Sequence, residues 1–226
     1  MKKEEIFENL FRAIVDLDED KGREAANELV KEKVDPLEGI EKGLSKAMKV
    51  IGERFEKLEI FLPELIMAAD VFNAAMEILR PQIAAEGKSE TKKGTVVIGT
   101  AGGDIHEIGK DIVALLLETA GFEVHNLGKS VPAATFLENA KKVKADIIGI
   151  SSLLTTTMLG QKDLIDILKA AGIRGEYIVM VGGGPVTQSW ANEIGADGYG
   201  KTAKDAVSVA LELMSKRRSM KERSNG

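Results

Sequence analysis

One loop of this chain carries residue types that suit metal binding. Asp104 and His106 are two residues apart in a glycine-rich stretch, Ala-Gly-Gly-Asp-Ile-His-Glu-Ile-Gly, at residues 101–109. A neutral imidazole is a good metal ligand, and a carboxylate usually holds its second nitrogen and raises its basicity. The glycines let the backbone turn sharply and let a bulky ligand approach closely. The loop predicts a site for a large ligand, with His106 as the candidate metal ligand and Asp104 behind it.

Two further segments carry residues that can bind a polar ligand. Residues 151–157 read Ser-Ser-Leu-Leu-Thr-Thr-Thr, and residues 182–185 read Gly-Gly-Gly-Pro. Hydroxyl groups can hydrogen-bond a buried polar group, and consecutive glycines offer a wall without side chains. We expect the two segments to border one crevice.

Each of these features also has an ordinary explanation. An isolated Asp-x-His pair suits a helix cap followed by a surface histidine. A run of Ser and Thr suits turns, and three glycines after a strand suit a phosphate loop or a tight turn. Their joint appearance after three strands of one sheet favours a site. The other histidine, His125, is expected to be structural and to have no carboxylate partner.

The second half of the chain predicts the elements that position this loop. Short apolar runs alternate with amphipathic segments, which indicates a parallel, doubly wound sheet with helices on both faces. The expected strands are 95–100, 123–127, 146–151, 177–182 and 198–199, and the expected helices are 108–120, 133–143, 157–171, 187–194 and 203–217. The fold class is therefore α/β, with a Rossmann-like (flavodoxin-like) five-stranded sheet. Ligands of such sheets bind at the carboxyl ends of the strands, here after the first, third and fourth.

The first half is expected to be helical throughout. Apolar residues recur at helical spacing, as in Ile6, Leu10 and Ile14. A third helix is expected from Asp35-Pro36 and a fourth after Leu62-Pro63. Such helices with short connections favour a four-helix bundle. The stripe residues are expected in the core, among them Leu17, Ile66, Met48, Met67 and Met76.

The stretch between the halves has no apolar side chain, so it cannot contribute to a core. We expect a helical cap domain at residues 1–86, a linker at 87–94 and a sheet domain at 95–226.

Composition excludes several classes of function. The net charge of -5, with acidic and basic residues interspersed, argues against nucleic acid as a partner. The chain has no cysteine, so disulfides, thiolate metal sites and cysteine nucleophiles are excluded. No apolar run approaches the roughly 18 residues that a membrane span needs. We expect a cytoplasmic protein without a membrane partner.

On these motifs the chain resembles the cobalamin-binding corrinoid proteins of methyltransferase systems, of the methylamine, methanol and O-demethylase type, and the cobalamin module of methionine synthase. The resemblance rests on Asp-x-His-x-x-Gly at 104–109, Ser-x-Leu at 151–153 and Gly-Gly at 182–183. The helical half is also similar, with Ile-Gly-Glu-Arg-Phe at 51–55 and Ile-Phe-Leu-Pro-Glu-Leu at 60–65. The resemblance covers nearly the whole chain.

The resemblance implies that His106 binds cobalt after displacing the cofactor's own dimethylbenzimidazole, and that Asp104 tunes this bond. The freed nucleotide tail would lie between the loops that begin at Ser151 and Gly182. The implied cofactor contacts of the sheet domain are Gly103, Asp104, Ile105, His106, Ile108, Gly109, Ser151, Leu153, Thr155, Thr157, Gly182, Gly183 and Ala203.

Two implied roles remain open at the level of sequence. Thr157 falls where methionine synthase has a serine that completes a relay with the Asp and His, so a relay here would use threonine. Phe55 and Leu62 match positions that shield the upper face of the corrin, although bundle core explains them too.

The resemblance implies a carrier that alternates between methylcobalamin and cob(I)alamin, with no catalytic residue of its own. Its expected partners are a substrate-specific methyltransferase, a second methyltransferase that accepts the methyl group, and a reductive activase. Three alternatives remain. They are a cobalamin-dependent sensor without its output domain, the small subunit of an adenosylcobalamin mutase, and a flavin-binding flavodoxin-like protein. The methyl donor and the oligomeric state are not predicted.

Overall fold

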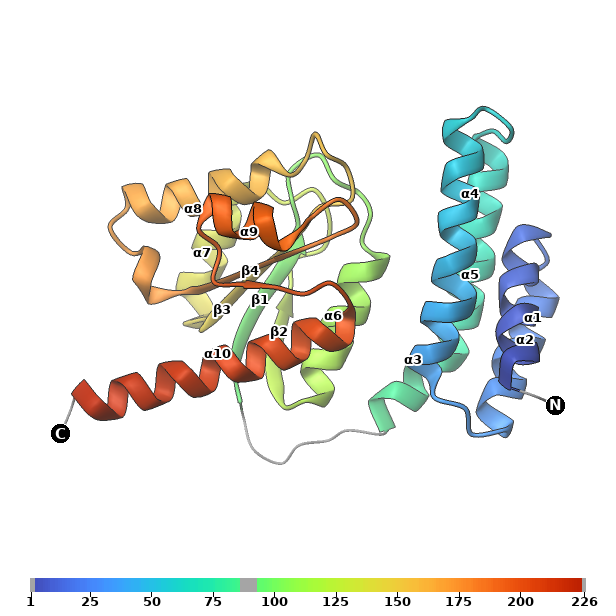
Figure 1. Cartoon of the computed structure of the whole chain (residues 1–226), viewed down its shortest axis with the longest axis horizontal. Coiled ribbons are helices and arrows are strands. Elements are labelled where there is room, and N and C mark those ends of the chain that lie inside the picture. Colours follow the sequence, from blue (N-terminus) through green and yellow to red (C-terminus); the bar gives the residue numbers. More distant parts are fainter. Residues whose placement is uncertain (1–2, 86–92, 225–226) are drawn as a thin grey trace. The chain divides into compact units, whose positions relative to one another are not determined.

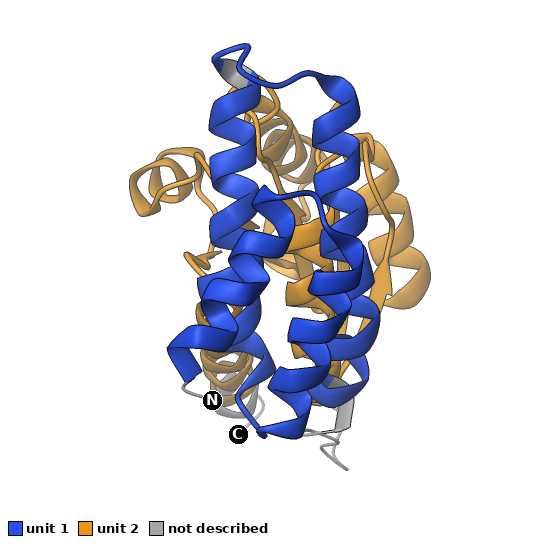
Figure 2. Cartoon of the chain, turned by 90° about the vertical axis from the view of Figure 1, so that its right-hand side faces the viewer, with its two compact units in different colours: residues 1–86 blue, residues 87–226 orange. Residues whose placement is uncertain are grey.

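The computed structural model describes residues 3–85 and 93–224, which form two compact units. The first unit is Met1–Glu86 and the second is Gly87–Gly226 (Figure 2). Most of the predicted linker, 87–94, lies outside the described residues, and its last residue, Gly94, begins the first strand. Within the described ranges no helix is long and apolar enough to span a bilayer.

The second unit contains the predicted parallel sheet. Its strands are β1 (Gly94–Thr100), β2 (Phe122–Asn126), β3 (Ile147–Ser151), β4 (Ile178–Gly182) and β5 (Gly198–Tyr199). They are ordered β2-β1-β3-β4-β5, and all neighbours are parallel. This order confirms the doubly wound α/β class. The strand order changes direction between β1 and β3. The carboxyl ends of these two strands lie side by side, because Thr100 pairs with Ser151. The crevice expected in such folds lies at this reversal.

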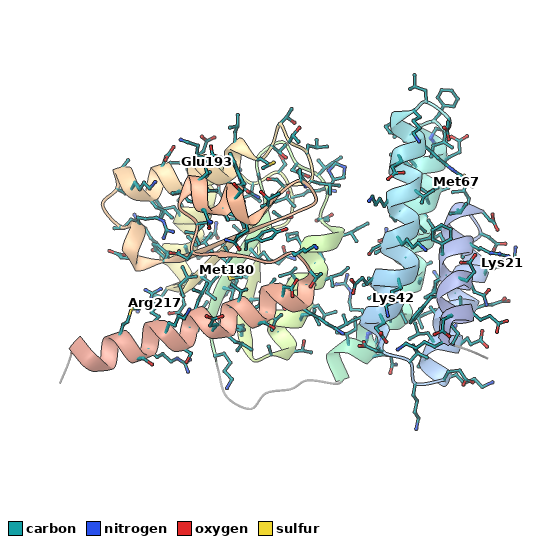
Figure 3. All side chains as sticks on the ribbon, in the orientation of Figure 1. Lys21, Lys42, Met67, Met180, Glu193 and Arg217 are labelled. Atoms are coloured by element: carbon teal, nitrogen blue, oxygen red, sulfur yellow. The ribbon has the colours of Figure 1, made fainter. Side chains whose placement is uncertain are left out.

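Helices cover both faces of the sheet (Figure 1). One face packs on α6 (Ile108–Thr119) and α10 (Ala203–Ser224), and the other on α7 (Ala133–Val143), α8 (Leu159–Ala170) and α9 (Gln188–Ile194). A short 3-10 helix, η2 (Arg174–Glu176), precedes β4. Side chains of a strand alternate between faces, so Val96 and Ile98 join the α10 side and Val97 the α7 side. Met180 of β4 also lies in the α10 layer (Figure 3).

Helix α10 is longer than the sequence predicted, because it continues past residue 217 to Ser224. Arg217, labelled in Figure 3, donates to the backbone carbonyls of Asp146 (3.1 Å) and Glu176. Arg218 donates to the carbonyl of Lys93 at 2.6 Å. These carbonyls lie at the amino-terminal ends of the strands, so the two arginines fasten α10 to the edge of the sheet opposite the expected crevice.

The first unit contains the predicted helices. They are α1 (Lys3–Val15), α2 (Glu19–Lys31), a continuous helix made of α3 (Pro36–Gly39), η1 (Ile40–Ser45) and α4 (Lys46–Glu56), and α5 (Leu62–Ala85). Asp35 caps the third helix as expected, since its carboxylate accepts from the Leu37 amide at 2.8 Å and Pro36 follows. The middle segment, η1, is π-helical, a widening that no sequence pattern predicted.

Three residues predicted in the core of this unit lie elsewhere. Leu17 falls after the end of α1, at a positive φ of 58°, and not on a helix. Ile66 and Met67, the latter labelled in Figure 3, are on α5 but exposed. Helical periodicity identifies a stripe, but whether a neighbour covers every turn of it is decided by packing. Met76, by contrast, is buried as predicted.

Candidate cofactor-binding site

The site is built on the loop between β1 and α6. Its central residue is Asp104, which is fully buried. One carboxylate oxygen, Oδ1, accepts hydrogen bonds from the backbone amide of His106 at 3.0 Å and is 2.9 Å from His106 Nδ1. The other, Oδ2, accepts from the amides of Leu153 at 2.7 Å and Leu154 at 3.3 Å, and from Thr157 Oγ1 at 2.7 Å. Both oxygens of this buried carboxylate are therefore satisfied by protein donors.

The hydrogen bonds keep Asp104 ionised. Burial acts to raise the pKa of Asp104, but the donors from Thr157, the His106 amide and the Leu153 amide outweigh it and lower the pKa to about 2. An ionised carboxylate only accepts hydrogen bonds. The proton between Asp104 and neutral His106 therefore belongs to Nδ1.

This proton placement leaves the other ring nitrogen available. With Nδ1 protonated, Nε2 of the neutral imidazole carries a lone pair. The His106 side chain is 42% exposed, and no group in residues 3–85 or 93–224 forms a hydrogen bond with Nε2. One free imidazole nitrogen, held by a buried carboxylate, suits a metal that brings further ligands of its own.

Thr157 completes a hydrogen-bonded chain with Asp104 and His106. Its Oγ1 is also 2.9 Å from the Leu154 carbonyl, so one hydroxyl hydrogen faces two acceptors. The hydrogen-bonded chain of Thr157, Asp104 and His106 that the sequence left open is therefore formed in the structure. It joins residues 53 positions apart, because the ends of β1 and β3 are adjacent.

The loop after β4 approaches the loop after β3 at the backbone. Gly183 has a φ of 117°, and a Cβ there would be 1.9 Å from the Ser152 carbonyl oxygen. Glycine is thus required at 183 by the protein itself. Gly182 differs, because its carbonyl accepts from the Ser152 amide at 3.1 Å while the space beside its Cα is less crowded. The two segments are therefore in direct backbone contact.

Gln161 is a site residue that sequence reasoning missed. It is fully buried, and its Nε2 donates to the carbonyls of Ile150 (3.2 Å) and Gly182 (3.0 Å). Its Oε1 accepts from Trp190 Nε1 at 2.9 Å. Gln161 therefore ties the carboxyl ends of β3 and β4 to α9. The signal was a glutamine in the apolar stripe that contains Leu164 and Leu168, where an unpaired amide would be costly.

The remaining predicted residues of this unit lie around the same edge of the sheet. Ile105, Leu153 and Thr155 are exposed, Ile108 begins α6, Ser151 ends β3 and Ala203 begins α10. At Gly109, no atom of the described residues lies within 4 Å of the position that a Cβ would take. Open space beside Gly109 fits a bulky ligand next to His106.

Phe55 and Leu62 belong to the helical unit. Phe55, on α4, is 36% exposed, and Leu62, the first residue of α5, is 58% exposed. Bundle core, the ordinary explanation, is therefore wrong for both. Around them lie Leu58, Phe61, Ile66 and Met67, which are also exposed.

The prediction for His125 was wrong in one respect. Glu123 lies two residues earlier, and its Oε1 is 3.1 Å from His125 Nε2. Both side chains are partly exposed on the edge strand β2, so this carboxylate is not held as Asp104 is. The spacing alone does not distinguish the two histidines, whereas burial of the carboxylate does.

Fold and site together define an α/β protein whose His106 imidazole is held by a buried carboxylate at the carboxyl edge of a parallel sheet. Comparison with known proteins identifies the family. Family models described as B12 binding domains match residues 94–208 and 6–80. The chain belongs to this family of B12-binding corrinoid proteins, and its cofactor is a cobalamin.

Close relatives and solved structures agree with this assignment. The chain is 52% identical to trimethylamine corrinoid protein 1 of Methanosarcina acetivorans, over 94% of this chain and 98% of that one. Identity to dimethylamine corrinoid protein 1 of the same organism is 46%, over 95% and 100%. The structure of the Methanosarcina barkeri monomethylamine corrinoid protein matches with a TM-score of 0.86 at 39% identity, covering 94% of this chain and 100% of that chain.

Proposed function

We propose that this chain carries methyl groups on a cobalamin bound through His106 Nε2, with the cofactor's own base displaced. The observation behind this proposal is the buried Asp104 carboxylate, which accepts from His106 Nδ1 and leaves Nε2 free. When bound, the corrinoid supplies a cobalt centre that accepts a methyl group and gives it up. Every other contribution comes from side chains and backbone groups of this chain.

The residues of the sheet unit orient the ligand nitrogen. Asp104 keeps the imidazole proton at Nδ1 and so directs the Nε2 lone pair outward. Thr157 and the amides of Leu153 and Leu154 hold Asp104 in turn. Both Asp104 and His106 thus tune the bond to cobalt without acting as autonomous catalytic residues.

The other predicted contacts serve the rest of the cofactor. Ile105, Ile108 and Leu153 would supply apolar surface to the cofactor, and Gly103 and Gly109 would let it approach the backbone closely. Ser151 and Thr155 hydrogen-bond the displaced tail in our proposal, with Gly182, Gly183 and Ala203 along it. The exposed Phe55 and Leu62 would supply apolar side chains that exclude water from the methyl group.

The names of the relatives favour methylamines as the source of the methyl group. They are described as trimethylamine and dimethylamine corrinoid proteins. A solved methanol:cobalamin methyltransferase complex from Methanosarcina barkeri also matches, with a TM-score of 0.52 at 32% identity, over 95% of this chain and 81% of that chain. We therefore propose a methylamine-specific methyltransferase as the donor partner. We also propose a second methyltransferase as the acceptor, a reductive activase as a further partner, and a cytoplasmic location.

The test identifies the axial nitrogen of cobalt by labelling the histidines of the protein with ¹⁵N. The protein is produced with ¹⁵N-histidine, loaded with hydroxocobalamin and reduced to the cobalt(II) form for electron paramagnetic resonance. Axial coupling to ¹⁵N gives doublets, whereas coupling to the unlabelled base of the cofactor gives triplets. We expect doublets in the wild type and in His125→Ala, and their loss in His106→Ala. Triplets in the labelled wild type, or doublets that survive in His106→Ala, would refute the assignment of the ligand.

A further inference from the structure

Asp104 is held at its backbone as well as at its carboxylate. Thr100, the last residue of β1, is fully buried, and its Oγ1 donates to the Asp104 carbonyl oxygen at 2.5 Å. The same Oγ1 accepts from the Ser130 amide at 2.8 Å. This amide is also 2.9 Å from the Asp104 carbonyl oxygen. The hydroxyl of Thr100 therefore joins the His106 loop to the segment that follows β2.

The Ser130 side chain adds a second contact between these segments. Ser130 Oγ accepts from the Gly103 amide at 3.0 Å, directly before Asp104. Gly103 has a φ of 83° and Ser130 one of 52°, so both residues lie in the left-handed region. Backbone of this kind persists when surrounding bonds hold it. The turn before Asp104 is thus fixed by Thr100 and Ser130 together.

The orientation of His106 depends on this turn. Both hydrogen bonds that orient the imidazole, from the His106 amide and from Nδ1, end on the same atom, Asp104 Oδ1. Ile105 is largely exposed, and the His106 side chain is 42% exposed. A rotation of the peptide after Asp104 would therefore move the His106 backbone and its imidazole, because the Oδ2 contacts to residues 153–157 hold the carboxylate but not this peptide.

We propose that Thr100 is a positioning residue for the axial ligand. Through its hydroxyl it sets the direction of the Asp104 peptide, and through Asp104 the direction of His106 Nε2. This inference rests on the proposed function, since it concerns the bond between His106 and cobalt. Hydrogen-bonded partners behind a metal ligand typically alter metal affinity by about 10-fold to 100-fold when they are removed.

The experiment compares two substitutions at one position. Thr100→Val removes the hydroxyl but keeps the branched shape, and Thr100→Ser keeps the hydroxyl. Each protein is loaded with hydroxocobalamin after ¹⁵N-histidine labelling. The dissociation constant and the cobalt(II) resonance spectrum are then measured, with the melting temperature of the cofactor-free protein. We expect Thr100→Val to bind cobalamin about 10-fold more weakly and to lose the ¹⁵N doublet in part of the molecules. Thr100→Ser should retain both.

These readouts separate a positioning role from a structural one. A lower melting temperature with wild-type affinity and doublets in Thr100→Val would overturn the proposal, because Thr100 would then serve only stability. Should Thr100→Val not fold, Thr100→Ala removes the same hydroxyl with a smaller side chain, and unchanged coupling and affinity there would overturn the proposal. Absence of doublets in the wild type would instead refute His106 as the ligand, so the two failures are distinguishable.

Discussion

At the scale of single residues, the carboxylates beside the two histidines differ in how firmly they are held. Asp104 and Glu123 each precede a histidine by two residues and each contact its ring. Asp104 is buried and takes three further donors from the β3 loop, whereas Glu123 is half exposed. A buried, saturated carboxylate holds an imidazole in one orientation, and an exposed one exchanges with water.

The low pKa of Asp104 predicts a specific acid sensitivity. Its pKa of about 2 in the folded protein lies below the 3.8 of an ordinary aspartate. A group with a depressed folded-state pKa stabilises the protein above its unfolded-state pKa, and this contribution is lost as the pH falls through the folded-state value. We expect the free energy of unfolding of the cofactor-free protein to fall between about pH 4 and pH 2. Urea titrations at a series of pH values measure it.

Two variants identify the source of that dependence. Asp104→Asn should be less stable at neutral pH, because the new side-chain NH2 group would face hydrogen-bond donors where the wild type has a carboxylate oxygen. Its free energy of unfolding should fall less than that of the wild type between these pH values. Asp163→Asn, at an exposed position on α8, controls for the removal of a negative charge. An equal acid slope in wild type and Asp104→Asn would exclude Asp104 as its cause.

At the scale of elements, the loops after β1, β3 and β4 use glycine for different reasons. Gly183 allows two backbone segments to approach, since a Cβ there would collide with the Ser152 carbonyl. Gly109, in the first turn of α6, meets nothing within 4 Å among the described residues. The first glycine serves the protein fold, and the second, in our proposal, serves the ligand.

This contrast predicts opposite effects of alanine at the two positions. Gly109→Ala should stabilise the cofactor-free protein by up to about 1 kcal/mol, because alanine is the better helix former, and yet weaken cobalamin binding. Gly183→Ala should destabilise the cofactor-free protein by more than about 2 kcal/mol through strain and collision. Urea unfolding and cobalamin titration measure both. Unchanged cobalamin affinity in Gly109→Ala would mean that the open space beside it is not used by the cofactor.

At the scale of the whole molecule, each unit has its own hydrophobic core, and intrinsic tryptophan fluorescence reports on the sheet unit. The chain has a single tryptophan, Trp190, on α9 of the sheet unit, where it donates to Gln161. The helical unit has none among its residues 1–86. Tryptophan fluorescence therefore follows the unfolding of the sheet unit, and far-ultraviolet circular dichroism follows helices of both.

Cobalamin should raise the midpoint of the fluorescence transition. A ligand that binds only the folded state at 100 times its dissociation constant adds about 2.7 kcal/mol of stability. Because the cofactor absorbs light, midpoints and not intensities are compared. His106→Ala should show a smaller rise at the same cobalamin concentration. A midpoint that cobalamin leaves unchanged in the wild type would contradict a cofactor site on the sheet unit.

Local patterns in the sequence were sufficient to locate the strands and most helices, and to identify the Asp-x-His-x-x-Gly motif. The predicted helix at 133–143 coincides with α7, and all five strands lie within one residue of their predicted positions. Alternating apolar runs encode burial on both faces of a sheet, and this signal is local. The Asp-x-His-x-x-Gly loop was recognisable for the same reason, since its residues are neighbours in the chain.

Contacts between distant loops could only be decided by the tertiary structure. The bonds from Thr157 and the Leu153 amide to Asp104, and from the Ser130 amide to Thr100, join residues 30 or more positions apart in the sequence. They exist because the strand order places the end of β1 between those of β2 and β3. The exposure of Phe55 and Leu62 also depended on which turns of a stripe are covered. Periodicity specifies which face of an element is apolar, whereas the partner of that face is set by how the chain folds back on itself.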